Sequence, residues 1–281
     1  MENMNYAFSR CLDVTSSEVT LMQRINFLEN LLDLQQKASI ENNISLLREK
    51  ETNETKSRFV SIASHEFRTF LTRIHLSASL IKDYHGRMDQ QKIYAHLDKI
   101  RMAVGDLTAI LDDFLSVERI DASKIDPVWK EFDLNILSGE VINEMQSLTK
   151  PGQTIKYKTV NVSSNLNLDK KLLKHCLVNL ISNAIKYSGD NGCIELTTNI
   201  QETRCQISVK DNGIGIPQAD QQRLFEAFFR ANNTGNIQGT GLGLNIVKRY
   251  IELMNGKISV ESTENIGTTF TLTFPIYPVI I

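Results

Sequence analysis

Apolar residues recur at helical spacing near the start of the chain. The first run steps by four, three and four residues, the spacing of one side of a coiled coil, through Leu21, Ile25, Leu28 and Leu32. Two polar residues follow on this seam, and apolar residues then return in a shifted phase. We therefore predict a coiled-coil or signalling helix over residues 1–55, with a frayed N-terminal helix as the alternative.

A second apolar stripe is longer and unbroken. It steps by four and three residues alternately through Ile93, Leu97, Ile100, Val104, Leu107, Leu111 and Phe114. A short turn at residues 84–89 separates it from the preceding helical region, so the two helices should run antiparallel, as a hairpin over residues 56–120. Because a lone hairpin would leave much of this stripe in water, we expect a homodimer in which a second copy completes a four-helix bundle.

The pattern becomes mixed after residue 120. Asp126-Pro127 breaks the helix, and we place a linker at residues 121–130. Strand-like alternation follows at residues 154–160, 193–200, 206–210, 257–261 and 268–274. Helical stretches lie at residues 135–148, 170–187, 218–228 and 242–254. The predicted fold class is α+β, with the helical hairpin followed, over residues 131–281, by an α/β sandwich that has helices on one face of a largely antiparallel sheet.

The composition is that of a soluble globular protein. Of the 281 residues, 41% are hydrophobic and 23% are charged. A net charge of -2 gives no reason to expect nucleic acid or an anionic membrane as the main partner. The four cysteines are scattered without a C-x-x-C spacing, as in the reduced thiols of a cytoplasmic protein. No run of 18 apolar residues occurs, so we expect no membrane segment, although the chain could be the cytosolic portion of a longer receptor.

Two asparagines four residues apart offer a cation site. Asn179 and Asn183 project from one face of a predicted helix, and amide oxygens combined with phosphate oxygens suit Mg²⁺. Lys186 lies near the same face, where it could meet a phosphate. On its own, this spacing favours a plain pair of surface asparagines.

Two glycine-rich segments supply the context. Residues 211–215, Asp-Asn-Gly-Ile-Gly, follow a strand; their glycines let the backbone approach a ligand, and the carboxylate can accept a hydrogen bond from an adenine amino group. A plain turn is the alternative. Gly239, Gly241 and Gly243 precede a helix whose free N–H groups and dipole attract phosphate, but no strand leads into them, as a Rossmann fingerprint requires. The polar stretch between, residues 230–238, has the character of a mobile lid.

A histidine lies in the helical region that precedes these segments. His65 can act as a nucleophile, because a neutral imidazole exists at physiological pH. Glu66 could accept a hydrogen bond from the other ring nitrogen and take up its proton. By itself, a His-Glu pair on a helix is more often ordinary surface polarity. The other histidines have no comparable neighbourhood and are expected to be structural or exposed: His75, His85, His96 and His175.

Taken in order, these motifs resemble the catalytic core of a two-component sensor histidine kinase. The resemblance covers residues 55–278, and although each motif is weak, the ordered set is specific. His65 matches the H box, Asn179 and Asn183 the N box, and Phe225 to Phe229 the F box. Asp211, Gly213 and Gly215 match the G1 box, and Gly239, Gly241 and Gly243 the G2 box. The implied fold is a dimerisation and histidine-phosphotransfer hairpin followed by a Bergerat-type (GHKL) ATP-binding domain.

The resemblance also implies an activity and its residues. ATP and Mg²⁺ are the expected cofactors, and Asn183 and Asn179 the metal ligands. His65 would be phosphorylated with Glu66 as its proton acceptor, and would pass the phosphoryl group to an aspartate of a response-regulator receiver domain. Thr69 completes an H-E-x-x-T pattern, which implies a phosphatase activity towards that regulator. The implied nucleotide-binding set is Asn179, Asn183, Lys186, Tyr187, Asp211, Gly213, Gly215, Phe225, Arg230, Gly239, Thr240, Gly241, Leu242 and Gly243.

Two alternatives stay open. Chaperone, topoisomerase and mismatch-repair ATPases share the nucleotide fold but resemble one another in a glutamate that activates water, where this chain has Asn179. An amide is no general base, so a kinase is favoured over an ATPase. Phe70 departs from the family pattern, which has a helix-bending proline there. We expect Phe70 to alter the balance of kinase and phosphatase states, and a catalytically silent or phosphatase-only scaffold is the alternative function.

Overall fold

The computed structural model describes residues 64, 66–84, 89–122, 124–160, 165–235, 237 and 239–276. All of these residues belong to one compact unit, Phe59–Ile281. The predicted N-terminal helix at residues 1–55 and the acceptor His65 therefore lie outside the described residues.

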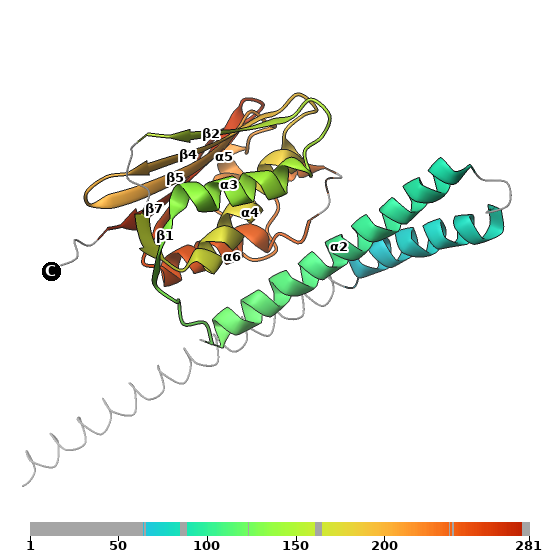
Figure 1. Ribbon diagram of the computed structural model, residues 1–281, viewed down its shortest axis with the longest axis horizontal. Coiled ribbons are helices and arrows are strands. Elements are labelled where there is room, and N and C mark those ends of the chain that lie inside the picture. The colour runs from blue at the N-terminus through green and yellow to red at the C-terminus, as the bar shows by residue number, and fades with distance from the viewer. Residues whose placement is uncertain are drawn as a thin grey trace, which may run out of the picture. The chain divides into compact units, whose positions relative to one another are not determined.

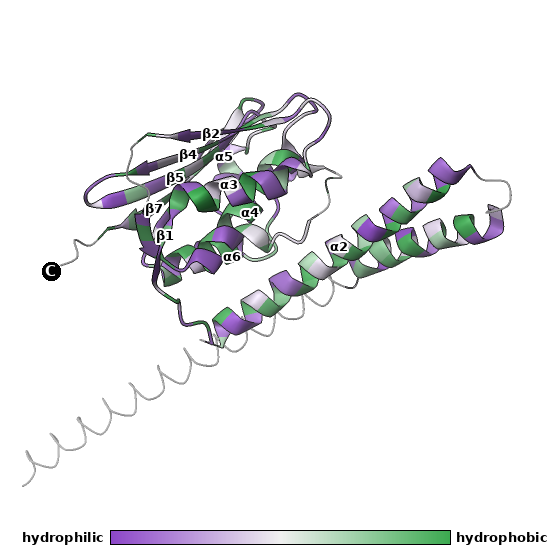
Figure 2. Ribbon diagram, in the orientation of Figure 1, coloured by the Kyte–Doolittle hydropathy of each residue, from purple (hydrophilic) through white to green (hydrophobic). Residues whose placement is uncertain are grey.

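Two helices form the hairpin. The first covers residues 66–84, and α2 covers Gln90–Asp121; they lie side by side in Figure 1. In Figure 2, hydrophobic and hydrophilic residues alternate along both helices, as expected for amphipathic helices. Their shared core is small and consists of Phe70, Ala103 and Ile110, with Phe67, Ile74 and Leu107 packed against it.

Only part of the predicted apolar stripe on α2 packs against the first helix of this hairpin. Ala103 and Ile110, which the stripe omitted, are buried, whereas Leu97, Val104 and Leu111 each remain 47% exposed. A single neighbouring helix covers a narrow arc of α2, so an apolar face about 100° wide cannot be buried by one contact. The heptad spacing located the helix, and the exposure of Leu97, Val104 and Leu111 agrees with the expectation that a lone hairpin leaves much of the stripe in water.

The remaining residues, 130–276, form what we call the α/β part. It is built on a five-stranded sheet. Its strand order is β2-β4-β5-β7-β6, in which β2 and β4 are parallel and the other neighbours are antiparallel. The strands are β2 (Thr154–Thr159), β4 (Cys193–Ile200), β5 (Arg204–Asp211), β7 (Gly267–Pro275) and β6 (Lys257–Thr263). Burial alternates along β5 and β7, so one face of the sheet meets the core.

Three helices cover that face (Figure 1): α3 (Leu134–Gln146), α4 (Lys170–Tyr187) and α6 (Gly243–Leu253). Two of them begin at aspartates that cap the helix N-terminus. Asp133 accepts hydrogen bonds from the backbone N–H groups of Asn135 and Ile136, and Asp169 caps α4 in the same way. The core between helices and sheet is continuous and fully closed, with Leu134, Leu177, Ile181, Leu196, Ile207 and Leu272 among its completely buried members.

Two local predictions need correction. The helix expected over residues 218–228 is only one turn long, α5 (Gln218–Gln221), because the chain then reverses through turns and Phe228 takes a left-handed φ of 64°. A further two-stranded antiparallel sheet, β1 (Lys130–Asp133) with β3 (Asn165–Leu168), was not predicted. Its four-residue strands are too short for period-two alternation to stand out. The predicted fold class, a helical hairpin followed by a helix-covered mixed sheet, is confirmed.

A helix that crosses a membrane must be long and predominantly apolar. No helix in the described residues is both long enough and apolar enough to do so.

Candidate functional site

A pocket of about 700 Å³ opens beside α4. One wall is the polar face of α4, another is the end of β5 with the turn that follows, and a third is the segment from Phe229 to Leu244 that leads into α6. The hairpin contributes a fourth wall through Glu66 and Phe70 of its first helix and through α2. The pocket thus joins segments more than a hundred residues apart in sequence.

The amide pair of α4 lines this pocket as predicted. The Nδ2 of Asn183 donates a hydrogen bond of 3.2 Å to the Oδ1 of Asn179, so the two amides are held together on one face. Gly243, the first residue of α6, lies directly against Asn179: a Cβ at this glycine would come within 2.5 Å of the asparagine Nδ2. The start of α6 therefore approaches α4 more closely than any side chain at position 243 would allow.

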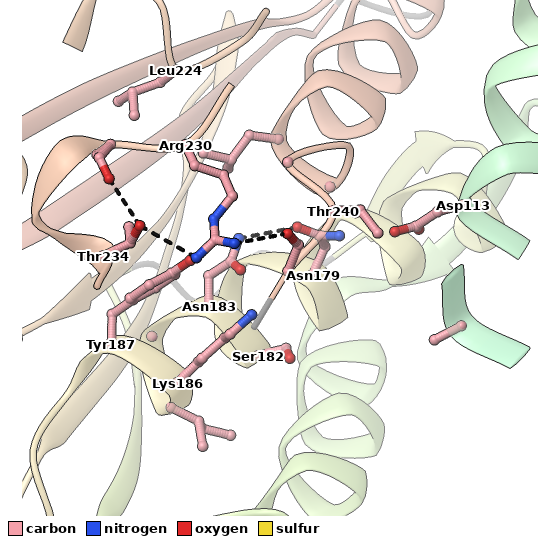
Figure 3. Close-up of a pocket in the computed structure, with 18 of the residues that line it drawn as sticks. Asp113, Asn179, Ser182, Asn183, Lys186, Tyr187, Leu224, Arg230, Thr234 and Thr240 are labelled. Atoms are coloured by element: carbon pink, nitrogen blue, oxygen red, sulfur yellow. Dashed lines mark hydrogen bonds between the residues drawn. The ribbon is translucent and has the colours of Figure 1, made fainter. Parts of the chain in front are cut away.

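Two cations face the pocket from opposite walls. Burial lowers the pKa of Lys186, and the nearby Arg230 lowers it further, whereas Glu66 and Asp106 raise it. Arg230 donates from Nη1 to the carbonyl of Gly239 at 3.4 Å and from Nη2 to the Oγ1 of Thr234, also at 3.4 Å. Figure 3 shows its guanidinium pointing from the lid towards α4. Two partly buried cations that repel each other have the chemistry to bind a phosphate chain.

The carboxylate at the end of β5 lies at the deep side of the pocket. Asp211 is buried, and its Oδ1 accepts a hydrogen bond of 2.8 Å from the backbone N–H of Gly213. Burial raises its pKa, while the backbone hydrogen bonds from Gly213 and Thr268 lower it. These backbone donors fix the orientation of the carboxylate, which leaves it able to accept a hydrogen bond from a ligand amino group.

The glycines of the turn after β5 are required by packing. Gly215 has a φ of 62°, and a Cβ there would lie 2.0 Å from the carbonyl oxygen of Thr263. At Gly213 a Cβ would lie 2.5 Å from the carbonyl oxygen of Tyr187. Both glycines are therefore needed for close contact with neighbouring backbone, in addition to any approach of the backbone to a ligand.

The segment before α6 is fixed at its base. Gly241 has a φ of 72°, and its carbonyl accepts a 3.0 Å hydrogen bond from the N–H of Phe228. The helix begins after Leu242 without a side-chain cap at that residue. The N–H groups of the first turn of α6 and the helix dipole therefore present positive charge at the pocket, as an anion site needs.

Most of the predicted site residues meet at this pocket. The members of the predicted set that line it are Glu66, Asn179, Asn183, Lys186, Tyr187, Asp211, Gly215, Arg230, Gly239, Thr240, Gly241 and Gly243. Thr69, Gly213, Phe225 and Leu242 do not line it. Phe225 instead packs against the core, with its carbonyl accepting a hydrogen bond of 2.8 Å from the Nδ2 of Asn245. His65 lies outside the described residues, next to Glu66.

Three titratable side chains at the pocket were not predicted. Asp106 and Asp113 of α2 line it, and burial raises the pKa of both, to about 6 for Asp113. His175 of α4 also lines it, although it was expected to be structural or exposed without a notable neighbourhood. Its Nε2 lies 4.0 Å from the Oδ1 of Asp113, and burial lowers its pKa. The one usable signal was its position four residues before Asn179, on the same helix face.

The donors present suit a hard cation bound together with phosphates. In the described residues, no group of three or more His, Cys, Asp or Glu side chains could hold a metal ion alone. The paired amides of Asn179 and Asn183 offer neutral oxygen ligands, which fits Mg²⁺ shared with a phosphate chain.

Comparison with protein families assigns both halves of the chain. Residues 55–123 match the His Kinase A (phospho-acceptor) domain, and residues 168–278 match the histidine kinase-, DNA gyrase B- and HSP90-like ATPase family. The curated relatives include the circadian input-output histidine kinase CikA of Synechococcus elongatus, 31% identical over 229 residues, which are 79% of this chain and 30% of CikA. Across the curated relatives reported, the chain spans between 27% and 48% of their lengths.

Two solved structures share the arrangement of the elements. The crystal structure of full-length ShkA in complex with AMPPNP has a TM-score of 0.56 and 25% identity, and covers 78% of this chain and 45% of that one. Histidine kinase ThkA in complex with response regulator protein TrrA has a TM-score of 0.54 and 26% identity, covering 78% and 61%. Together with the ordered motifs and the pocket that they line, these matches place the chain in the two-component sensor histidine kinase family, of which it contains the catalytic core.

Proposed function

We propose that the protein is an ATP-dependent protein-histidine kinase that phosphorylates His65. The observation that carries this proposal is the composition of the pocket: one cavity is lined by Asn179, Asn183 and Lys186 of α4, by the glycines before α6 and by Glu66. Glu66 follows His65 directly, and consecutive Cα atoms lie about 3.8 Å apart. A nucleotide bound here would therefore present its terminal phosphate near the acceptor.

In the proposed reaction the lone pair of a ring nitrogen of His65 attacks the γ-phosphorus of ATP. An N–P bond forms while the bond from the γ-phosphorus to the β–γ bridging oxygen breaks, so ADP leaves with that electron pair. The proton on the other ring nitrogen passes to Glu66, which lines the pocket beside the acceptor. Lys186 and Arg230 would bind the phosphate oxygens and stabilise the charge that moves onto ADP.

Mg²⁺ would offset phosphate charge when bound, with the amide oxygens of Asn183 and Asn179 as its protein ligands. The same residues disfavour hydrolysis. Asn179 occupies the position at which related ATPases use a glutamate to activate water, and its amide is hydrogen-bonded to Asn183. Without a general base for water, the phosphoryl group should persist until the imidazole attacks.

The phosphoryl group would be passed to an aspartate of a response-regulator receiver domain. In a separate phosphatase reaction, Thr69 would orient the water that hydrolyses this aspartyl phosphate and releases inorganic phosphate. The complex of ThkA with response regulator protein TrrA supports this class of partner. Thr69 does not line the nucleotide pocket, which is consistent with a role towards the regulator instead of ATP. The chain would act in the cytoplasm, with the domain limits given by the sequence: residues 56–120, 121–130 and 131–281.

The protein would function as a homodimer through the hairpin. Several large apolar side chains of the hairpin are exposed, namely Leu71, Leu76, Leu97, Val104, Leu111 and Leu115. Within α2, Leu97, Val104 and Leu111 are seven residues apart and form one line along the helix. A second hairpin packed on this line would bury it and complete a four-helix bundle.

Incubation with γ-labelled ATP tests the kinase. The parent protein should acquire label that is lost in acid and retained in alkali, as for a phosphoramidate, and His65→Ala should acquire none. Asn183→Ala, which keeps the acceptor, should bind the nucleotide poorly and also remain unlabelled. Binding of ATP by the parent without any acid-labile label would exclude the kinase and favour the phosphatase-only scaffold.

A further inference from the structure

The last turns of α2 make a specific contact with the α/β part of the same chain. Val117 and Ile120 pack against the core cluster of that part. Polar pairs flank this apolar centre: the Nη1 of Arg249 lies 2.6 Å from the Oδ1 of Asp121, and Asp113 faces His175 at 4.0 Å. We call the α2 side of this contact, Asp113, Ser116, Val117, Ile120 and Asp121, the docking face.

The spacing of the docking face shows that it is one side of a helix. Its members follow one another at steps of three, one, three and one residues, which repeats every helical turn. The opposing residues come from two helices: His175 from α4, and Arg249 and Tyr250 from α6. A contact with an apolar centre, the Asp121–Arg249 ion pair at one edge and the polar pair of Asp113 and His175 at the other has one preferred register.

The aromatic side of the contact is also ordered. The rings of His175 and Tyr250 meet edge to face at a centroid distance of 5.4 Å. Burial raises the pKa of Tyr250, and the Ser116 side chain of α2 opposes this shift. Figure 3 shows Asp113 pointing from α2 towards the side of the pocket formed by Thr240 and Asn179. The contact therefore lies next to the nucleotide pocket.

The first hairpin helix of the same chain also reaches the pocket. The pocket takes Glu66 and Phe70 from the first hairpin helix of the same chain, in addition to Asp106 and Asp113 of α2. Glu66 is also close enough to Lys186 of α4 to raise its pKa. Within one chain, the docked arrangement thus brings the residue next to the acceptor to the lysine that would bind phosphate.

We propose that the docking face positions the acceptor helix at the nucleotide pocket of its own chain, so that the phosphoryl group is transferred within one subunit of the dimer. This inference rests on the proposed kinase activity and specifies its geometry. The acceptor His65 and the nucleotide site that supplies its phosphoryl group then belong to the same polypeptide. Asp121 and Arg249 are positioning residues in this scheme, since neither lines the pocket.

Mixed dimers test transfer within a chain. One subunit carries His65→Ala and keeps its nucleotide site; the other carries Asn179→Ala with Asn183→Ala and keeps its acceptor. The two are co-expressed with different affinity tags, purified through both tags, and incubated with γ-labelled ATP beside the parent. We expect no label on either subunit. Label on the chain that lacks the nucleotide asparagines would overturn the proposal, whereas an unlabelled parent would refute the kinase itself.

Charge reversal tests the docking face separately. Arg249→Glu and Asp121→Lys should each lower the autophosphorylation rate by roughly three- to tenfold at low salt, because an exposed pair is replaced by a repulsive one. ATP affinity should change less than the rate, because neither residue lines the pocket. The double exchange, Asp121→Lys with Arg249→Glu, should restore most of the rate, and Lys257→Glu on β6 serves as the matched control. Failure of the exchange to restore the rate would count against positioning by this pair.

Discussion

The hairpin and the α/β part bury their apolar residues in different ways. The α/β part closes a continuous core around Leu177, Leu196 and Leu272, none of which is accessible to solvent. In the described hairpin only Phe70, Ala103 and Ile110 form a buried cluster, and leucines remain exposed along both helices. A part that completes its own core can fold alone, whereas an incomplete core requires a partner. We therefore expect the dimer contact in the hairpin and an autonomous fold in the α/β part, against whose core α2 packs with Val117 and Ile120.

The largest effect is expected for Phe70→Pro in the hairpin. Phe70 is 3% exposed, so the substitution removes most of a buried aromatic ring, worth about 3–5 kcal/mol, and a helical N–H, worth about 3 kcal/mol more in a helix interior. Phe70→Ala is the matched control, because it removes the ring and keeps the N–H. The ratio of autophosphorylation to regulator dephosphorylation should differ between the two variants. Equal ratios in parent, alanine and proline forms would show that Phe70 does not set the balance.

In the α/β part, Leu177→Ala should lower the free energy of unfolding by about 2–5 kcal/mol, since Leu177 is fully buried in the closed core. Urea unfolding followed by far-UV circular dichroism measures this change. The loss should be the same at high and low protein concentration, because no second copy contributes to this core. A concentration-dependent loss would contradict the autonomy of the α/β part.

In the hairpin, Leu111→Asp should weaken self-association by roughly 2 kcal/mol, the value of burying a leucine side chain at an interface. Leu111 is about half exposed in the single chain, so the fold of one hairpin should survive the change. Sedimentation equilibrium of the variant beside Lys99→Asp, an exposed control on α2, provides the measurement. A variant that remains as dimeric as the control would place the dimer contact elsewhere.

The smallest effect concerns pH at the docking face. Burial, with a smaller effect of Asp112, raises the pKa of Asp113 from 3.8 to about 6, so the docked state favours the protonated carboxyl. The stabilisation from this group is present below its ordinary pKa and is lost as pH rises through about 6. Asp113 alone should weaken docking by about 1–2 kcal/mol between pH 5 and pH 7.5.

Energy transfer between one dye on the hairpin and another on the α/β part follows this change. Asp113→Asn should show a smaller loss of transfer over the same pH range, because the amide does not ionise. His175 acts with the opposite sign: burial lowers its pKa, so its contribution is lost as pH falls. If the variant lost as much energy transfer as the parent above pH 6, Asp113 would not be the source of the pH dependence.

Sequence patterns located the regular elements of the α/β part with good accuracy. The predicted helix at residues 170–187 coincides with α4. The aspartate at its N-cap, its apolar period and the serine that follows its last residue all indicate the same bounds. The predicted helix at residues 218–228 was wrong, because the chain turns after Gln221 to place Phe228 beside Gly241. Local helical propensity does not include that tertiary constraint.

The candidate site could be predicted only where its residues form local motifs. Asn179 and Asn183 were found by their spacing together with the glycine-rich segments that follow them, and their amides meet on one helix face as expected. Asp113 and His175 were missed because their proximity arises from the packing of α2 against α4, which no local pattern encodes. For the same reason, the apolar stripe on α2 identified the helix and did not distinguish Ala103 and Ile110, which face the first helix, from the residues left exposed.

The hydrogen bond between Phe228 and Gly241 has a consequence for how the protein can vary. It ties together the two ends of the intervening loop, whose first residues are also anchored: Asn232 donates hydrogen bonds to Asp220, and Asn233 donates one to the carbonyl of Gly215. The entropy of closing a flexible loop grows logarithmically, and doubling its length costs only about 0.6 kcal/mol. Insertions after these anchors, at residues 235–239, should therefore leave folding almost unchanged while they alter how long a nucleotide remains bound. A change in loop length alone would thus alter the turnover rate, without any substitution in the residues that contact phosphate.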